Sequence, residues 1–215
     1  MIKAFLFDFD GVVADSPHLN FRSWQQAFSE QALAISELEY FRMEGMGPRG
    51  IAKHFCLQNG IDPLRDEEFV VRKEAFMVSL GNPSIYEGIY SLLKSLNSQG
   101  IKLALVTGAS KQRITRSLPE TLALLFDAIV TSDDVTHTKP HPEPYLNAAD
   151  ALGITPEEAV VIENAPLGIE AAKKGGFFCI AITTTLPVSE LQSADEVVLN
   201  HATLAEAVFR QARSA

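Results

Sequence analysis

The stretch Ile2-Lys3-Ala4-Phe5-Leu6-Phe7-Asp8-Phe9-Asp10-Gly11 decides the fold class of this sequence. Its apolar part is short, and it stops at two aspartates and a glycine. A run of this length that ends at a glycine is typical of a buried β-strand, because a buried helix needs more residues. We therefore predict a strand that ends directly before Asp8.

Four similar apolar runs recur along the chain, and each is followed by polar or glycine-containing residues. They lie at residues 102–107, 128–131, 159–163 and 177–182. Helix-like segments closed by glycine lie between them, at residues 86–99, 143–152 and 167–174. Strands that alternate with helices in this way indicate βαβ units. The prediction is an α/β protein with a doubly wound, parallel, Rossmann-like sheet.

Residues 17–83 do not follow this alternation of strands and helices. They contain helical patterns at 21–32, 51–58 and 67–78, a turn-rich interruption at 45–50, and no strand candidate. We interpret them as an α-helical insertion placed just after the first strand. The expected organisation is a core made of residues 1–16 and 84–215, with an inserted helical cap domain of residues 17–83.

The composition excludes several classes of protein. The 215 residues include 18 Lys and Arg against 27 Asp and Glu, a net charge of −9, and 47% are hydrophobic. This balance excludes an intrinsically disordered chain. An acidic chain without a basic run is not expected to hold nucleic acid or an anionic membrane by bulk charge.

Cellular location is predicted from what the sequence lacks. No apolar stretch reaches the length of a membrane span, and the N-terminal apolar run contains Lys3 and ends on Asp8, unlike a signal peptide. The two cysteines, Cys56 and Cys179, form neither a disulfide framework nor a zinc-binding pattern, which fits a reducing compartment. We expect a soluble, cytoplasmic protein and a monomer.

Polar residues follow the predicted strands at the edge of the sheet where ligands bind in such folds. They are Asp8 and Asp10 after the first strand, Thr107 after the second, Asp133 and Asp134 after the third, Glu163 and Asn164 after the fourth, and Lys139 in the loop before Pro140. The set offers a nucleophile, oxygen ligands for a hard cation, a hydroxyl and a fixed positive charge. Phosphoryl transfer requires these groups.

Each group has a place in such a reaction. Asp8 can attack phosphorus and form an aspartyl phosphate, while Asp10 can protonate the leaving group and later activate water. Clustered carboxylates repel one another and a phosphate, so we expect a cation, and Mg²⁺ prefers oxygen ligands. Lys139 and Thr107 are expected to bind phosphoryl oxygens, and Gly11 to let the backbone turn tightly and present its N–H groups.

Four motifs in this order connect the chain to a known family. They are Asp8-Phe9-Asp10-Gly11-Val12-Val13-Ala14-Asp15-Ser16, Val106-Thr107-Gly108-Ala109-Ser110, Lys139-Pro140-His141-Pro142-Glu143-Pro144 and Val161-Ile162-Glu163-Asn164-Ala165-Pro166-Leu167-Gly168. On these motifs the sequence resembles the haloacid dehalogenase superfamily of phosphohydrolases, and within it the β-phosphoglucomutase-like enzymes.

The resemblance implies a role for each motif. Asp8 would be the nucleophile, Asp10 the acid and base whose carbonyl also binds Mg²⁺, and Thr107 and Lys139 the phosphate-binding residues. The helical insertion would be a mobile cap that closes over the site and selects the substrate. Further expected residues are Gly11, Gly108 and Ala109 at the substrate, and Glu163 and Asn164 at the metal.

The fourth motif departs from the subgroup, which usually has an acidic pair where this chain has Glu163-Asn164. An amide oxygen can still bind Mg²⁺, but it brings one negative charge less. Glu44, beside the glycine turn of the cap, is a candidate to supply that charge. Our hypothesis is that cap closure brings Glu44 to the metal, against the alternative that Glu44 is a solvated cap residue.

Other cap residues carry expectations about the substrate. Enzymes of this subgroup have a histidine where this chain has Asn20, which weakens a mutase assignment, and His18 would replace that histidine only if the loop were shifted. Arg49 in the glycine-rich turn is a candidate clamp for a second anionic group. Lys73 matches a cap lysine that contacts substrate in relatives, although a lysine on a helix face is usually solvated.

The loop residues around Lys139 carry further expectations. One of Asp133 and Asp134 is expected to orient Lys139 or a metal-bound water, and the other to face solvent. His137 and His141 flank Lys139 without the spacing of a metal-ligand set.

The predicted function is a Mg²⁺-dependent phosphatase that acts on a small phosphorylated metabolite through an aspartyl phosphate. A β-phosphoglucomutase-like sugar phosphomutase and an inorganic pyrophosphatase stay open as alternatives. A receiver-like signalling domain is disfavoured because such a domain is about half this length and has its aspartate after the third strand. A non-catalytic binding protein would be expected to have lost Asp8, Asp10 or Lys139, and dehalogenation is disfavoured by the presence of Asp10.

Overall fold

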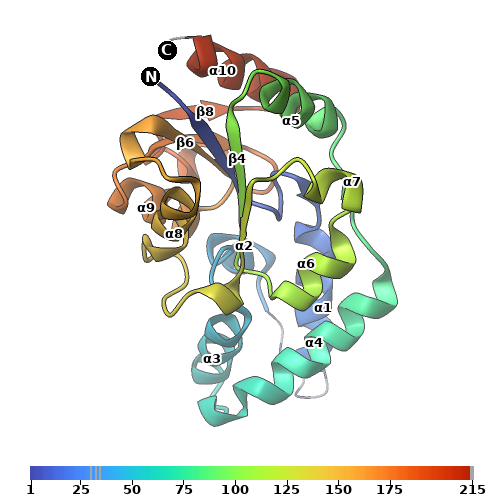
Figure 1. Cartoon of the computed structure of the whole chain (residues 1–215). Helices are drawn as coiled ribbons and strands as arrows, with labels where there is room; N and C mark the ends of the chain where they lie inside the picture. The colour runs from blue at the N-terminus through green and yellow to red at the C-terminus, as the bar shows by residue number, and fades with distance from the viewer. Residues whose placement is uncertain (30, 32, 34, 214–215) are drawn as a thin grey trace.

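The computed structural model describes residues 1–29, 31, 33 and 35–213. Figure 1 shows two units placed end to end, a sheet with helices on both faces and a smaller group of helices. The sheet has six parallel strands in the order β5 (Ala128–Val130), β4 (Lys102–Val106), β1 (Ala4–Phe7), β6 (Ala159–Glu163), β7 (Phe178–Ile182) and β8 (Glu196–Val198). The predicted α/β fold with a doubly wound parallel sheet is confirmed.

Alternate residues of β1 face opposite layers of helices, as the pleat of a strand requires. Ala4 and Leu6 pack on the side of α8 (Glu143–Leu152) and α9 (Pro166–Lys174). Phe5 and Phe7 pack on the side of α5 (Ile89–Ser98) and α10 (His201–Arg213). Because both faces are covered, β1 is apolar throughout, and this is why its sequence is a continuous apolar run.

Among the residues that the structure describes, the sheet unit contains two further short helices, between β4 and β5, and three 3₁₀ turns. They are α6 (Lys111–Ser117), α7 (Glu120–Ala123) and the 3₁₀ turns η2 (Ser132–Asp134), η3 (Pro156–Glu158) and η4 (Val188–Glu190). The apolar pattern did not predict β8, because this edge strand has three residues and begins with a glutamate.

The helical unit is held by an aromatic core. It consists of α1 (Pro17–Ser29), α2 (Glu37–Arg42), α3 (Pro48–Gln58), η1 (Pro63–Arg65) and α4 (Asp66–Leu80). Phe28 stacks on Phe69 with ring centroids 4.3 Å apart, and Trp24 and Phe55 complete the cluster. The predicted helix at 21–32 begins earlier, at Pro17, and part of its predicted end lies outside the described residues. The helix α2 was not predicted.

Two short strands join the units. β2 (Ala14–Asp15) pairs antiparallel with β3 (Ser84–Ile85), so both chain connections between the units run side by side. Tyr86 N donates to Val13 O at 3.1 Å, and the Tyr86 hydroxyl donates to Asp15 Oδ1 at the same distance. In the part of the chain that the structure describes, no helix combines the length and the apolar character that crossing a membrane requires.

Candidate active site

Asp8 lies directly after β1, where its backbone N–H extends the sheet by donating to Ile162 O at 3.0 Å. Its carboxylate meets Lys139, whose Nζ lies 2.6 Å from Asp8 Oδ1 and 2.6 Å from Glu163 Oε1. All three side chains are buried. The carboxyl ends of two neighbouring strands therefore bring two carboxylates onto one lysine, as the strand-end argument predicted for this edge of the sheet.

The protonation of this group reflects burial and charge together. Burial raises the pKa of Asp8 to about 8, although the Lys139 cation acts in the opposite direction. Burial acts to lower the pKa of Lys139, yet the Asp8 and Glu163 carboxylates raise it above its ordinary value. Lys139 is thus a permanent cation, whereas Asp8 needs a further positive charge nearby to stay ionised at neutral pH.

Glu163 does not have the position expected of a metal ligand. Its Oε1 accepts from Lys139 Nζ and from the Tyr145 hydroxyl at 2.7 Å, and its Oε2 accepts from the backbone N–H groups of Asn164 at 2.9 Å and Ala165 at 3.2 Å. Four donors occupy its four lone-pair sites. We therefore correct the prediction that Glu163 binds the cation, since the residue instead orients Lys139.

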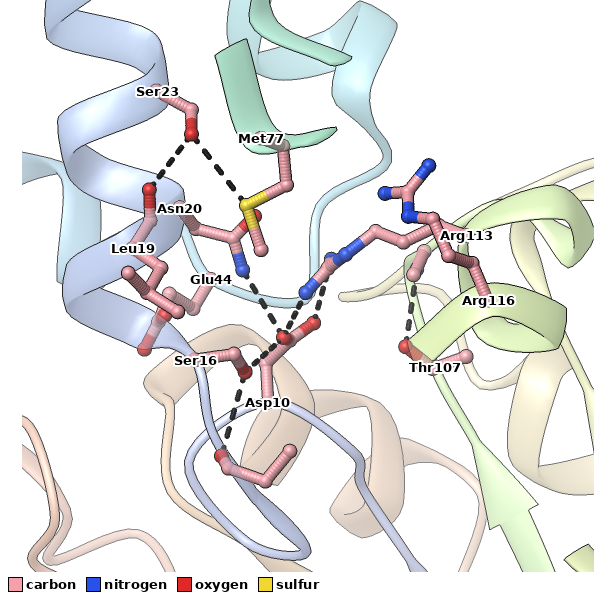
Figure 2. Close-up of polar contacts among 12 residues, drawn as sticks. Asp10, Ser16, Leu19, Asn20, Ser23, Glu44, Met77, Thr107, Arg113 and Arg116 are labelled. Carbon is pink, nitrogen blue, oxygen red and sulfur yellow. Dashed lines mark hydrogen bonds and ion pairs between the residues drawn. The ribbon is translucent and has the colours of Figure 1, made fainter. Parts of the chain in front are cut away.

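Asp10 faces a different set of partners (Figure 2). Its Oδ1 accepts from Ser16 Oγ, from Asn20 Nδ2 at 3.0 Å and from Arg113 Nη2, and its Oδ2 accepts from Arg113 Nη1 at 3.0 Å. Burial acts to raise the pKa of Asp10, but the charge and hydrogen bonds of Arg113 outweigh it and the pKa is lowered. Asn20, expected at the substrate, is thus aimed at Asp10.

Arg113 was missed by the sequence analysis. It lies in the first turn of α6, whose N-cap Ser110 is the last residue of the second motif. The start of a helix that follows a strand in such a sheet lies at the ligand-binding edge. Arg113 therefore occupies a position from which a long side chain reaches the site, and this position was the available signal.

Glu44 reaches from the helical unit to the fourth motif. Asn164 Nδ2 donates to Glu44 Oε2 at 3.1 Å and to Thr185 Oγ1 at 3.2 Å. Glu44 is buried, so it is not the solvated residue of the alternative hypothesis, and burial together with the Asp10 and Asp8 charges raises its pKa well above the usual value. Among the described residues, Glu44 Oε1 and Asn164 Oδ1 are buried without a hydrogen-bond partner. Two unsatisfied oxygens beside carboxylates fit a hard cation.

Two glycines allow backbone and side chains to approach closely here. Gly11 has a φ of +81°, and a Cβ at this position would lie 2.2 Å from Asn164 Nδ2. A Cβ on Gly108 would lie 2.8 Å from Gly45 O, so this glycine lets the cap turn touch the second motif. Thr107 Oγ1 accepts from Ala109 N at 3.0 Å. Thr107 lines a narrow gap with Lys139, Gly45 and Gly108.

Both units line one small cavity of about 40 Å³ above the aspartates, a space for a few water molecules. The lining residues are Asp8, Asp10, Asn20, Trp24, Tyr40, Glu44, Gly45, Met46, Pro48, Ile51, Lys73, Glu74, Gly108, Ala109, Ser110 and Arg113. Lys73 is buried there, 2.8 Å from Glu74 Oε1 and 5.9 Å from the Trp24 ring centroid. Burial, with a smaller effect of the Arg113 charge, lowers the pKa of Lys73 to about 8.

Arg49 does not line this cavity. Its guanidinium binds Asp66, with Nε 2.9 Å from Oδ2, and its side chain is 63% exposed. We therefore correct the prediction that Arg49 clamps the substrate, because its partner lies on α4 at the outside of the helical unit.

The loops around Lys139 also differ from expectation. Asp134 Oδ2 accepts from Thr131 N and Oγ1, and Asp133 Oδ2 accepts from Lys111 N, so these contacts do not orient Lys139, and the alternative that one of them orients a metal-bound water stays a prediction. His137 and His141 lie close enough to Glu143 for one cation to be shared, a grouping that spacing alone did not indicate. Both Glu143 oxygens already accept from backbone N–H groups, of Thr136 at 2.6 Å and of His137 at 3.0 Å.

Comparisons with known proteins agree with this geometry. Validoxylamine A 7′-phosphate phosphatase from Streptomyces hygroscopicus subsp. limoneus is 33% identical over 199 residues, which cover 91% of this chain and 92% of that protein. Hexitol phosphatase A from Escherichia coli K12 is 30% identical over 210 residues, covering 91% and 90%. The crystal structure of β-phosphoglucomutase from Clostridium difficile superimposes with a TM-score of 0.81 at 25% identity, covering 96% of each chain.

The fold and the buried acidic site thus define an α/β hydrolytic or transfer enzyme that acts on phosphorylated compounds. The family described as "Haloacid dehalogenase-like hydrolase" matches residues 5–182, and the chain belongs to this family. The resemblance noted from the four motifs is therefore confirmed.

Proposed function

We propose that this protein is a Mg²⁺-dependent phosphatase that hydrolyses a small phosphorylated metabolite through an aspartyl phosphate on Asp8. The observation that carries the proposal is the buried contact of 2.6 Å between Lys139 Nζ and Asp8 Oδ1. Lys139 holds one oxygen of Asp8 and leaves the other to attack. The same cation can stabilise a phosphoryl oxygen as charge develops on it.

The reaction has two displacements. In the first, Asp8 Oδ2 bonds to phosphorus and the ester P–O bond breaks, while Asp10, which must enter this step protonated, gives its proton to the leaving oxygen. In the second, Asp10 takes a proton from water, the water oxygen bonds to phosphorus, and the bond to Asp8 breaks, which releases inorganic phosphate. Lys139, the Thr107 hydroxyl and the N–H groups of Gly108 and Ala109 would hold the phosphoryl oxygens throughout.

The residues present fit a magnesium ion. Asp8, the Asp10 carbonyl, Asn164 Oδ1 and Glu44 Oε1 would hold it, and the last two are the buried oxygens without a hydrogen-bond partner among the described residues. Asp8 and Glu163 share the Lys139 cation, and Glu44 is a third buried acidic side chain close by, on Asn164. When bound, Mg²⁺ supplies the positive charge that keeps Asp8 ionised and draws charge from the transferred phosphoryl group.

The proposed cap domain is residues 17–83, and the catalytic core is residues 1–16 and 84–215. A cavity of about 40 Å³ is too small for a phosphorylated metabolite, so substrate entry requires the two units to move apart. The Glu44 contact with Asn164 would then form on closure and would couple closure to metal binding.

Hydrolysis is favoured over mutase activity by the cap. Asn20 stands where a β-phosphoglucomutase-like enzyme has histidine, and Arg49 binds Asp66 outside the cavity. A mutase must hold a bisphosphorylated intermediate in two orientations, whereas water needs no binding site of its own. The names of the phosphatase relatives support the same reaction class.

Hydrolysis of p-nitrophenyl phosphate tests the proposal. We expect Mg²⁺-dependent release of p-nitrophenol that EDTA abolishes and that Asp8→Asn reduces to background. Asp150→Asn, at an exposed position of α8, is the matched control and should keep wild-type activity. Equal rates in wild type and Asp8→Asn would exclude the aspartyl phosphate.

A further inference from the structure

We propose that Arg113 is a specificity-determining residue, and that the leaving group of the natural substrate carries an anionic group of its own close to the scissile phosphate ester. This inference rests on the proposed phosphatase function and names the substrate class of the same site. The argument starts from the way Arg113 and Asp10 are bound to each other.

Arg113 forms a bidentate pair with both carboxylate oxygens of Asp10 (Figure 2). Its side chain is only 5% exposed and lines the cavity. Among the described residues, its Nε is buried and has no hydrogen-bond partner. A guanidinium has five donors, so this one has a donor left for a ligand.

The two oxygens of Asp10 are not equivalent. Oδ1 also accepts from Ser16 and Asn20, whereas Oδ2 accepts from Arg113 Nη1. A carboxylate that acts on a leaving oxygen must have one of its own oxygens free to contact it. Since Oδ1 is anchored from two further sides, Oδ2 is the oxygen that must exchange its partner. The exchange breaks the contact between Oδ2 and Arg113 Nη1, while Nη2 keeps its contact with Oδ1. To act as the acid, Oδ2 must also carry a proton, and a protonated Asp10 no longer balances the charge of Arg113.

The surroundings of Arg113 do not supply a replacement. The neighbouring carboxylate, Glu74, is shared by Lys73 at 2.8 Å and Arg116 at 3.8 Å. Arg49, the cation that the sequence offered for a second anionic group, pairs with Asp66 instead. A buried guanidinium without a counter-charge is strongly unfavourable. The partner that replaces Asp10 must therefore arrive with the substrate.

An anionic group on the leaving part of the substrate meets this requirement. A carboxylate or a second phosphate can accept from the Nη1 that Asp10 Oδ2 releases and can balance the guanidinium charge, and Lys73 lines the same cavity. A hydroxyl would accept a hydrogen bond but would leave the positive charge unbalanced. Recognition of the substrate would thus release Asp10 toward the leaving oxygen.

The test compares matched substrates in the presence of Mg²⁺. The first pair is 2-phosphoglycolate and 2-hydroxyethyl phosphate, which differ by a carboxylate in place of a hydroxymethyl group. The second is propane-1,3-diol bisphosphate and 3-hydroxypropyl phosphate, which tests a second phosphate. We expect wild-type kcat/KM to favour the anionic member of at least one pair by tenfold or more, and the pair that shows it identifies the anion.

Arg113→Gln should reduce this preference to near one, because the anionic substrate loses its partner and the neutral one does not. Arg113→Lys keeps the charge but lacks the bidentate geometry, so its preference should lie between the two. Arg116→Gln, one turn along α6 and outside the cavity lining, should keep the wild-type preference. Equal losses for both members of a pair in Arg113→Gln, or no preference in wild type, would overturn the proposal.

A measurement on wild type alone guards against variants that do not fold. Phosphonoacetate and 2-hydroxyethylphosphonate, with the bisphosphonate of propane as a third probe, are tested as inhibitors of p-nitrophenyl phosphate hydrolysis. An anionic inhibitor should have an inhibition constant at least tenfold below the neutral one, and equal constants would refute the inference. Failure of p-nitrophenyl phosphate hydrolysis itself would refute the phosphatase function instead, which separates the two outcomes.

Discussion

The two aspartates of the first motif lie two residues apart and have opposite kinds of surroundings. Asp8 contacts Lys139, and Lys139 contacts Glu163, so every member of this group belongs to the sheet unit. Asp10 contacts Arg113 from the sheet unit, Asn20 from α1 of the helical unit, and Ser16 at the junction. The first group lies within the sheet unit, whereas the second would lose its Asn20 contact if the units separated.

Lys139→Ala is expected to have the largest effect, because it breaks the group that lies within one unit. The variant leaves Asp8 and Glu163 facing each other without their cation, and we expect kcat to fall about 10²- to 10³-fold. Breaking such a buried pair should also lower the free energy of unfolding by about 3–5 kcal/mol. Activity with p-nitrophenyl phosphate and urea denaturation measure the two effects.

The exposed Lys174 on α9, which pairs with Glu170 at 2.6 Å, provides the control. Lys174→Ala should retain wild-type kcat and stability. A Lys139→Ala protein with wild-type kcat would show that the group around Asp8 does not carry the reaction.

Glu44→Ala is expected to have an intermediate effect. It removes the cap residue that binds Asn164, next to Glu163 of the group within the sheet unit. With inorganic phosphate bound, the dissociation constant of Mg²⁺ should rise about tenfold, as it does when a metal site loses a supporting carboxylate. Calorimetric titration measures it. Glu67→Ala, with a side chain 66% exposed, is the control. The same Mg²⁺ affinity in wild type and Glu44→Ala would contradict the hypothesis that Glu44 serves the metal.

Arg49→Ala is expected to have the smallest effect, because this residue belongs to neither group. Hydrogen bonding to Arg49 lowers the pKa of Asp66, so the pair stabilises the fold above the unfolded pKa of about 3.9 and the contribution is lost as pH falls through the lower folded value. The stability difference between wild type and variant should therefore be present at neutral pH and shrink in acid. Thermal unfolding at pH 7 and pH 3 measures this, while kcat/KM should not change. A large loss of kcat/KM in Arg49→Ala would restore the substrate-clamp hypothesis.

The sequence was sufficient for the parts of the site that depend on strand ends. Asp8 follows an apolar run that forms β1, and parallel strands end at one edge of a sheet, so the meeting of Asp8 with residues after other strands was predictable. The six-stranded sheet was predictable for the same reason, apart from β8. That strand is short and starts with a charge, and its pairing with β7 decides its structure.

The remaining residues depend on contacts that a linear pattern does not contain. Glu163 has the residue type of a metal ligand, but four donors from separate segments already occupy its oxygens. Arg49 has the residue type of an anion clamp, but its exposed guanidinium pairs with the buried Asp66 at the start of α4. Arg113 was missed because it lies outside the four motifs, and only its burial against Asp10 distinguishes it.

The ribbon of β2 and β3 has a mechanical consequence for the proposed closure. Both connections between the units pass through the paired strands β2 and β3. We therefore expect the helical unit to rotate relative to the sheet unit about an axis through this ribbon. Ser16 directly follows β2 and therefore sits almost on that axis, where any rotation moves atoms least. Its bond to Asp10 can persist through the proposed rotation, whereas the contact of Asn20 from the helical unit must break.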